Sequence, residues 1–547
     1  MFGLKGAYFY FTAVQLTLIK FIKKIYFTTN RYNKSLRSKI PAQVFFNPNP
    51  FLLSIISPYK IKSFKINKIN PNDFWLENKN INIADHHNFL WLNLIDRKDD
   101  GKNIQKIIYL WMLKYSRFKR KVWDSSTLSL RIISWLLNID IIINNGTFDF
   151  KKNFFESIIS QCNHLKKNIS FEKDYQKKIE VITALIISGI IFKEYEDNYN
   201  IAIKELEKFV KTYFDKDGFP VTRNPNDLIF FTKFTLLSYE IIKDAHQYIP
   251  EFLDEIIKKN LSSIKSIKTP NDQVPFFNGG SENYLMNFDK YLENLRLNKK
   301  EKKSIIGGIF IAKSKHQALY FDVGSPPNKN FSKNYQSGPL SFEYYLDGIK
   351  IISNCGFGNN ISSKAELISK LTASQSTLTI NDTSVTQFER NKLINRVFGN
   401  SIKNTFKTSN LNLKNDNLLL GCSITHNGYE KKFGCIYKRE IYLNVKSNKL
   451  TGIDHILKKS DGIPIRYVFR FHLNPELTAV KTMSGNSALI QISRNKSLLF
   501  SIKDENVEIE KSIFLGGKKI LDSTCISISG NLVNKDKSFH WEIIKKI

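Results

Sequence analysis

Apolar residues between about 100 and 270 repeat with the spacing of an α-helix. From Ile104 to Tyr115 they recur at i, i+3, i+4, i+7 and i+8, positions that lie on one helical face. The segment VITALIISGIIF (181 to 192) is apolar on all sides, which predicts an inner helix. Further helices are predicted near 127 to 138, 152 to 165, 200 to 214, 227 to 246 and 253 to 264. Short polar links between these helices predict an all-α domain of stacked helical hairpins.

The pattern changes after about residue 305, where short runs of aromatic and β-branched residues dominate. Asp347-Gly348 separates two of these runs and is a strong hairpin signal. Such a series of strands predicts a sandwich of large antiparallel sheets. The predicted strands are 317 to 323, 340 to 346, 349 to 353, 376 to 380, 435 to 443 and 465 to 473.

A chain of 547 residues is longer than one hydrophobic core usually serves, which favours two large domains. We expect the helical domain over 61–300 and the sandwich over 305–547, with the boundary in the polar stretch RLNKKEKKS (296 to 304). Residues 1–60 are expected to form an N-terminal amphipathic helix and a lead-in.

The apolar run from Ala7 to Ile19 is too short to span a bilayer and contains Gln15. No small-residue cleavage site precedes the lysines that follow, so a secretory signal is not indicated. The helix could lie on a membrane surface or dock on its own domain. The compartment stays open between the cell envelope or periplasm and the cytoplasm, and the oligomeric state is not indicated.

The formal net charge of +32 favours a partner rich in negative charge. Because lysine is spread over both halves of the chain, compositional drift explains the charge equally well. No nucleic-acid-binding motif accompanies it, so an acidic polysaccharide is the more probable partner than nucleic acid. The five cysteines are odd in number and widely spaced, which predicts free buried thiols and no disulfide framework.

Several segments of the second half resemble, in order and spacing, the core of the heparinase II/III-like polysaccharide lyases of bacteria. They are YFDVGSPP (320 to 327), SGPLSFEYYLDGIKIISNCG (337 to 356), TASQSTLTINDTS (372 to 384), THNGYEKKFGCIYKREIYL (425 to 443) and YVFRFHLNP (467 to 475). In the first half, HHNFLWLNLI (86 to 95), VWDSSTLSLRIISW (122 to 135), DGFPVTRNPND (217 to 227) and PFFNGGSE (275 to 282) resemble segments of the family's helical domain.

The resemblance implies an α/α-toroid followed by an antiparallel β-sandwich. It also implies β-elimination on a uronic-acid-containing polysaccharide such as a glycosaminoglycan, in which the C5 proton is removed and the C4 oxygen leaves. Family members use an Asn or His pair and a Tyr from the toroid, with a His from the sandwich. A metal held by His and Asp braces the sandwich.

This chain departs from the family at those positions. The two histidines before LSFE fall on Asn334 and Gln336, the acidic metal position on Asn354, and the His of the AHNTL-like strand on Gln375. A neutral amide is a weak zinc ligand and better suited to calcium, and it does not exchange protons near neutral pH. We therefore expect no certain cofactor and a lost metal site. The Asn-His motif, sought near KKIEVITAL (177 to 185), is missing there.

Three residues are candidates for catalysis. Tyr335, in the loop before the LSFE strand, could act as a base if nearby lysines lowered its pKa. Gln375 could touch a sugar hydroxyl, and His426 could carry a proton. For Tyr335 and His426 the alternative is a packed structural role, and for Gln375 a neutral network within the sandwich.

Four residues are candidates for substrate binding. Arg223 could clamp a carboxylate through two hydrogen bonds, and Asn224 lies beside it. Gln336 offers amide donors and acceptors, and Tyr429 could line a cleft. The alternative for Arg223 is an ordinary surface arginine. For Gln336 and Tyr429 the alternative is a structural role that holds strands or loops together.

Two functions from different classes follow. The first is a lyase that acts on an acidic polysaccharide. The alternative is a non-catalytic descendant that binds glycan or scaffolds the envelope, which the amides at the family's acid-base positions would suit. A basic protein that adheres to nucleic acid is a weaker third hypothesis.

Overall fold

The computed structural model describes residues 4–58, 70–75, 82–97, 101–144, 146–282, 288, 291, 303–459, 464–533 and 535–546, with side chains from residue 9 onward. The chain divides into two compact units. The helical unit comprises Val14–Tyr213 and Phe230–Lys258, and the sandwich unit comprises Met1–Ala13, Phe214–Ile229 and Lys259–Ile547. Most of the predicted boundary (296 to 304) lies outside the described residues, so that boundary stays a prediction.

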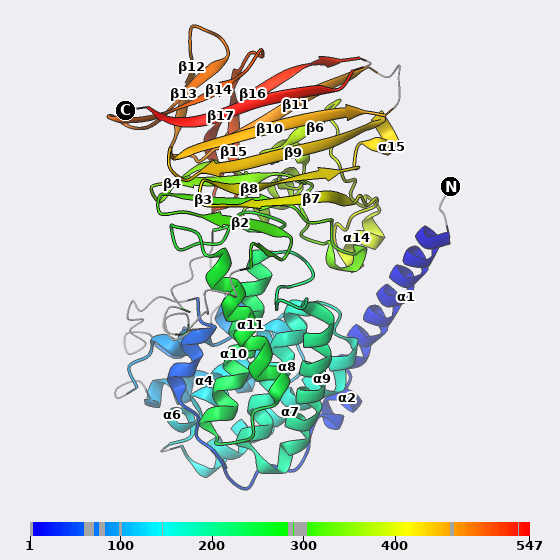
Figure 1. Cartoon of the computed structure of the whole chain (residues 1–547). Coiled ribbons are helices and arrows are strands. Elements are labelled where there is room, and N and C mark those ends of the chain that lie inside the picture. The colour runs from blue at the N-terminus through cyan, green and yellow to red at the C-terminus, as the bar shows by residue number, and fades with distance from the viewer. Residues whose placement is uncertain are drawn as a thin grey trace. The chain divides into compact units, whose positions relative to one another are not determined.

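The periodic segments form helices (Figure 1), as predicted. The apolar stripe of α4 is buried along its length, because its residues recur on one helical face. α10 and α11 each contribute residues to both units. The described α-helices up to residue 267 are α1 (Leu4–Phe27), α2 (Asn30–Ser35), α3 (Ile83–His87), α4 (Gly101–Tyr115), α5 (Ser125–Leu137), α6 (Ile139–Ile143), α7 (Phe148–Asn168), α8 (Tyr175–Ile191), α9 (Glu196–Tyr213), α10 (Pro225–Asp244) and α11 (Glu251–Ile267).

α8 is the inner helix of the helical unit. Every residue from Ile179 to Ile191 is buried, and α8 packs against α5, α7 and α9. A β-carbon at Gly189 would lie 2.4 Å from the backbone nitrogen of Tyr199, so glycine is what lets α8 and α9 approach so closely. The apolar segment that predicted an inner helix is therefore confirmed.

The sandwich unit contains a nine-stranded and an eight-stranded antiparallel sheet. The first runs in the order β1-β2-β3-β4-β5-β11-β16-β15, with β6 paired to β11, and the second runs β12-β13-β14-β17-β10-β9-β8-β7. The first comprises β1 (Ile305–Ile306), β2 (Ile309–Lys313), β3 (Gln317–Asp322), β4 (Phe342–Leu346), β5 (Ile349–Ser353), β6 (Leu378–Ile380), β11 (Ile465–Leu473), β15 (Glu508–Phe514) and β16 (Leu521–Leu532). The second comprises β7 (Thr408–Asn415), β8 (Leu419–His426), β9 (Cys435–Asn444), β10 (Lys449–Lys458), β12 (Thr478–Lys481), β13 (Ser487–Ser493), β14 (Lys496–Ile502) and β17 (Lys537–Lys546).

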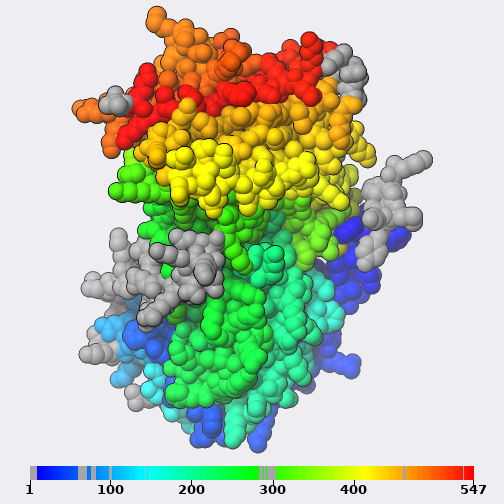
Figure 2. All heavy atoms as spheres, viewed as in Figure 1, coloured from blue at the N-terminus to red at the C-terminus, as the bar shows by residue number. Residues whose placement is uncertain are grey.

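The two sheets differ in which faces they bury. β9 and β10 alternate between buried and partly exposed residues, so one face of their sheet meets the core. Side chains of the yellow and orange part of the chain form a continuous outer surface in Figure 2. β3 and β4 are buried on both faces, and described residues between 259 and 282 of the same unit contact both strands. Tyr320, for example, donates a hydrogen bond from its hydroxyl to the Lys268 carbonyl oxygen (2.8 Å).

The predicted hairpin at Asp347-Gly348 is confirmed. Both residues have positive φ, 50° and 82°, as the tight turn between β4 and β5 requires. The predicted free thiols are also confirmed, because all five cysteines are unpaired and buried.

A buried ion pair joins β9 and β10 of the second sheet on the face that meets the core. The Arg439 Nε lies 2.6 Å from Asp454 Oδ1, with both side chains almost fully buried. Arg439 Nη1 donates to the carbonyl oxygens of Leu340 and Ser376, each at 2.8 Å, which lie next to strands of the first sheet. Asp454 also accepts from the Tyr437 hydroxyl and the Trp541 indole. Each of these buried polar groups therefore has a partner in the opposite sheet or the next strand.

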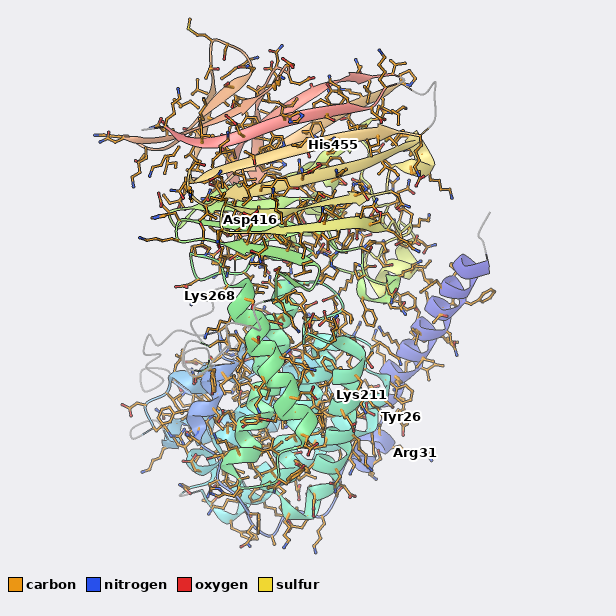
Figure 3. The ribbon with its side chains drawn as sticks, viewed as in Figure 1. Tyr26, Arg31, Lys211, Lys268, Asp416 and His455 are labelled. Carbon is orange, nitrogen blue, oxygen red and sulfur yellow. The ribbon has the colours of Figure 1, made fainter. Side chains whose placement is uncertain are left out.

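The N-terminal helix α1 exposes a run of large apolar side chains, including Phe11, Leu18, Phe21, Ile22 and Ile25. Tyr26 and Arg31 mark the region where α1 ends and α2 begins (Figure 3). None of the described helices is long and apolar enough to cross a membrane.

Candidate functional site

Gln336, Asn354 and Gln375, which the motifs predict at the family's metal positions, come together in the sandwich unit. We call them the amide cluster. The side-chain Nε2 atoms of Gln336 and Gln375 both donate to the Ser369 carbonyl oxygen, at 2.8 and 2.9 Å. Asn354 Oδ1 accepts from the backbone N–H of Ser376, the residue after Gln375 (2.9 Å). The fold of the sandwich therefore brings together the three residues that the motifs predicted as a group.

Backbone groups fix the orientation of the amides. Gln336 Oε1 accepts from the Gly279 N–H (3.0 Å), so its nitrogen must face the carbonyl oxygens of Gly356 and Ser369. Asn354 Nδ2 donates to the Phe276 carbonyl oxygen (3.2 Å). The amide cluster thus holds the loop around residues 275 to 282 against the sandwich.

The amide cluster does not fit a metal ion. A metal needs several oxygen or nitrogen lone pairs that converge on one point, whereas the oxygens of Gln336 and Asn354 accept from two different backbone N–H groups, those of Gly279 and Ser376. Nitrogen donors of Gln336 and Gln375 instead converge on one carbonyl oxygen. Within the described ranges no three His, Cys, Asp or Glu side chains are grouped so that they could hold a metal. Direct hydrogen bonds therefore hold these segments of the sandwich unit together, which is the structural role that the resemblance assigns to a metal.

Arg223 and Asn224 lie in the same unit and are buried. Arg223 forms an ion pair with Asp322 and donates to the carbonyl oxygens of Gly307, Gly308, Gly324 and Ser325. Asn224 accepts from the Asn226 N–H (2.9 Å), and a β-carbon at Gly279 would lie 2.6 Å from its Nδ2. The N–H groups of the Arg223 guanidinium already donate to groups of the protein itself. A role of Arg223 in substrate binding stays a prediction.

Tyr335 is buried, and its hydroxyl has no hydrogen-bond partner among the described residues. Burial, with a smaller contribution from Asp322, raises its pKa. A base would need the opposite shift, so the environment does not prepare Tyr335 to take a proton.

His426 and Tyr429 are also buried. His426 Nδ1 accepts from the Gly428 N–H (3.0 Å), and Tyr429 donates to the carbonyl oxygens of Leu378 and Thr383. Burial lowers the pKa of His426 to about 3, with a smaller contribution from Arg439. His426 is therefore neutral at physiological pH. Its proposed role as a proton carrier and the role of Tyr429 in binding stay predictions, as does a catalytic role for Gln375.

The lowered pKa of His426 predicts a loss of stability in acid. Between pH 6.5 and about 3 the unfolded histidine binds a proton that the folded one excludes. The free energy of unfolding should therefore fall by about 1.4 kcal/mol per pH unit from this residue as pH decreases through that window. Urea unfolding at a series of pH values measures the slope. His426→Gln should reduce it, and His540→Gln, at an exposed position, should leave it unchanged. An equal slope in wild type and His426→Gln would contradict the prediction.

The helical unit contains a buried carboxyl group that the sequence patterns did not single out. Glu180 lies in α8, within the segment where the Asn-His motif was sought. Its Oε2 atom has no hydrogen-bond partner in the part of the chain that the structure describes. Burial raises its pKa to about 8, although the Ser126 hydroxyl and Lys177 act in the opposite direction. Glu180 is therefore mostly protonated near neutral pH and can donate a hydrogen bond.

Comparison with protein families matches residues 302–542 to the model of the family "Heparinase II/III-like, C-terminal". This part of the chain is a heparinase II/III-like C-terminal domain. No curated protein sequence matches the chain. The amide cluster lies within this range, and its correspondence to the family's metal positions stays a prediction.

Solved structures share the fold of the chain at low identity. A crystal structure of heparinase III has a TM-score of 0.67 and 13% identity, and covers 97% of this chain and 91% of its own. Heparan sulfate lyase HepC from Pedobacter heparinus has a TM-score of 0.62 and 14% identity, with coverage of 84% and 75%. The chain thus has a heparinase-like polysaccharide lyase fold, with a helical region followed by antiparallel sheets. The predicted fold class is confirmed.

Proposed function

We propose that the protein is a polysaccharide lyase that cleaves a uronic-acid-containing polymer by β-elimination. The observation that carries the proposal is the heparinase II/III-like C-terminal domain at residues 302–542. Heparan sulfate, the polymer named for one similar structure, is an acidic polysaccharide of this kind. The net charge of +32 would attract such a polymer over a distance and less strongly at high salt.

Elimination requires that the charge of the uronate carboxylate be neutralised, so that the C5 proton becomes acidic. We assign this step to Glu180. A protonated carboxyl in an apolar site can donate a hydrogen bond to an anionic oxygen, as a neutral amide would. The unpartnered Oε2 atom and the raised pKa of Glu180 support this role.

A second function, binding of the same polymer without cleavage, is favoured by the amide cluster. Its three side chains cannot exchange protons, and each is hydrogen-bonded to backbone groups. The exposed apolar residues of α1 support the predicted contact with a membrane surface, which would suit a protein of the cell envelope.

The test is incubation of the full chain with heparan sulfate, hyaluronan, alginate and polygalacturonate. Elimination creates a C4–C5 double bond conjugated to the carboxylate, so near-ultraviolet absorbance should rise with at least one polymer. Carboxyl-reduced heparan sulfate is the matched control, because it lacks the group that acidifies C5. If no polymer produces absorbance, the lyase proposal fails. Retention of the chain on an immobilised polymer would then support the binding function.

A further inference from the structure

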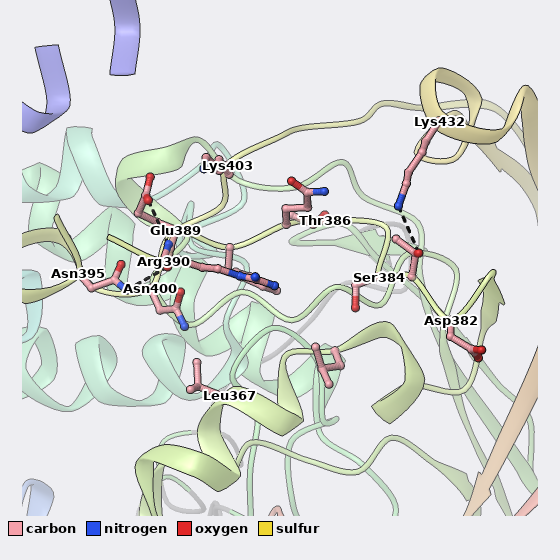
Figure 4. A pocket seen from close by; sticks show the side chains of 14 residues that line it. Leu367, Asp382, Ser384, Thr386, Glu389, Arg390, Asn395, Asn400, Lys403 and Lys432 are labelled. Atoms are coloured by element: carbon pink, nitrogen blue, oxygen red, sulfur yellow. Dashed lines mark hydrogen bonds between the residues drawn. The ribbon is translucent and has the colours of Figure 1, made fainter. Parts of the chain in front are cut away.

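The sandwich unit contains a pocket of about 770 Å³, and none of its lining residues is among the candidate site residues of the sequence analysis. Its volume lies within the range of pockets that hold small ligands. The wall is built from loops and short helices that follow β6, together with α13 (Ser363–Ser369), α14 (Lys392–Phe398) and α15 (Glu430–Phe433). In Figure 4, Lys432 and Asp382 lie at one end, and Glu389, Arg390, Asn395 and Asn400 at the other.

Three cations line the pocket without a matching carboxylate. They are Arg390, Lys403 and Lys432, and none forms an ion pair within the described ranges. The two acidic residues of the lining are already engaged. Asp382 pairs with Arg466 at 3.0 Å, and Glu389 Oε1 accepts the backbone N–H groups of Arg390 and Asn391. The unpaired charge that remains is positive, which favours an anionic ligand.

Neutral polar atoms in the same wall also lack partners. Thr386 is only 1% exposed, and its hydroxyl has no hydrogen bond among the described residues. The side-chain oxygens of Asn395 and Asn400 are buried and equally unpartnered. Buried polar atoms are normally satisfied, so three such atoms beside one pocket point to a ligand that supplies donors. Sugar hydroxyl groups are donors of this kind.

The remaining lining residues include exposed apolar side chains. Leu367 and Leu371 are 51% and 43% exposed, and Phe388 is partly buried beside them. Apolar side chains next to cations and acceptor oxygens suit a pyranose ring, which has C–H faces between its hydroxyl and charged groups.

The wall is already organised without a ligand. The fully buried Lys370 donates from Nζ to the carbonyl oxygens of Lys333 and Asn400. Asn395 Nδ2 donates to the Glu389 carbonyl oxygen at 2.9 Å. A pocket whose walls are fixed in advance loses little freedom when a ligand binds.

From the unpaired cations, the unpartnered oxygens and the apolar rim, we propose that this pocket binds an acidic sugar segment, with one carboxylate or sulfate group facing Arg390 and another facing Lys432. The link to a uronate polymer rests on the proposed function. The pocket itself rests on the contacts described above.

Titration calorimetry on the full chain tests the proposal with three tetrasaccharides. One derives from heparan sulfate (carboxylate and sulfate), one from alginate (carboxylate alone) and one from cellulose (neutral). Wild type should bind one or both acidic probes and should bind the neutral one weakly. Binding of the alginate probe would identify carboxylate as sufficient, and binding of the heparan sulfate probe alone would identify sulfate as required.

The variants separate the pocket from general charge attraction. Arg390→Ala with Lys432→Ala should weaken binding about tenfold or more, because two charge-assisted hydrogen bonds are lost. The matched control is Lys392→Ala with Arg396→Ala, which removes the same charge from exposed positions of α14 outside the lining. Thr386→Val should weaken binding about threefold to tenfold while the net charge stays the same.

Equal losses in the two double variants, or no binding of either acidic probe by wild type, would overturn the proposal. If the protein eliminates a polymer but the pocket variants still bind the tetrasaccharides normally, the proposed sugar-binding role of the pocket is wrong and the proposed lyase function stands. If the pocket variants lose binding and the protein eliminates no polymer, the result would support sugar binding in the pocket and refute the lyase function.

Discussion

Replacing Glu180 with leucine is expected to lower the rate of elimination by about 10²–10³-fold, which is the typical cost of losing one donor to a developing anion. Leucine keeps the volume of the side chain and removes the hydrogen bond to the uronate carboxylate. Glu180→Gln keeps a donor at the same place, so it should restore most of the rate. Initial rates of near-ultraviolet absorbance with the preferred polymer measure both effects.

The pH dependence of the rate tests the same assignment independently. The pKa of Glu180 is about 8, so the side chain ionises above that pH and would then repel the substrate carboxylate. The wild-type rate should fall above about pH 8, whereas the Glu180→Gln rate should not fall there, because glutamine does not ionise. Glu207→Gln, at a surface ion pair of α9, is the control and should keep the wild-type profile. A purely structural Glu180 would give parallel profiles in wild type and Glu180→Gln.

The elements of the fold could be predicted from local pattern because their periods differ. The strand predicted over 435 to 443 is β9, and its alternation of buried and partly exposed residues is the pattern that predicted it. The hairpin at Asp347-Gly348 follows from two residues that tolerate positive φ. Both depend on neighbours in the sequence, so no knowledge of the packing was needed.

The candidate site could be predicted only in part. The motifs identified Gln336, Asn354 and Gln375, and the structure brings them together, but their partners come from distant segments. Gly279, for example, is 57 residues from Gln336. The sequence therefore predicted which residues stand at the family's metal positions, and gave no sign that backbone groups would bind them.

Glu180 was missed for a different reason. The apolar run that predicted an inner helix was read from residue 181, and Glu180 directly precedes it. A carboxyl next to an all-apolar helix is itself a signal, because such a group is buried only if a neighbouring element covers it. Its environment includes Ser126 of α5, which no local pattern places beside α8.

Arg439→Ala is expected to lower the free energy of unfolding by about 3–5 kcal/mol, because it leaves the Asp454 carboxylate buried without its counter-charge. The alternation of buried and partly exposed residues along β9 places Arg439 on the buried face of the strand. Arg439 shares the inward face with Tyr437 and Ile441, so a charged side chain had to enter the core. Urea unfolding, followed by circular dichroism of the full chain, measures the loss.

A matched control is available on the surface of the same unit. Arg466 pairs with Asp382 at 3.0 Å, but the two side chains are 56% and 62% exposed. Arg466→Ala should therefore cost only about 0–1 kcal/mol. The contrast follows from solvation, since water screens the exposed pair and compensates Asp382 when its partner is removed. In the core only protein groups can compensate, and Asp454 would keep the Tyr437 hydroxyl and the Trp541 indole but no cation. Equal losses in the two variants would mean that Asp454 becomes protonated or hydrated without cost, and would contradict the prediction.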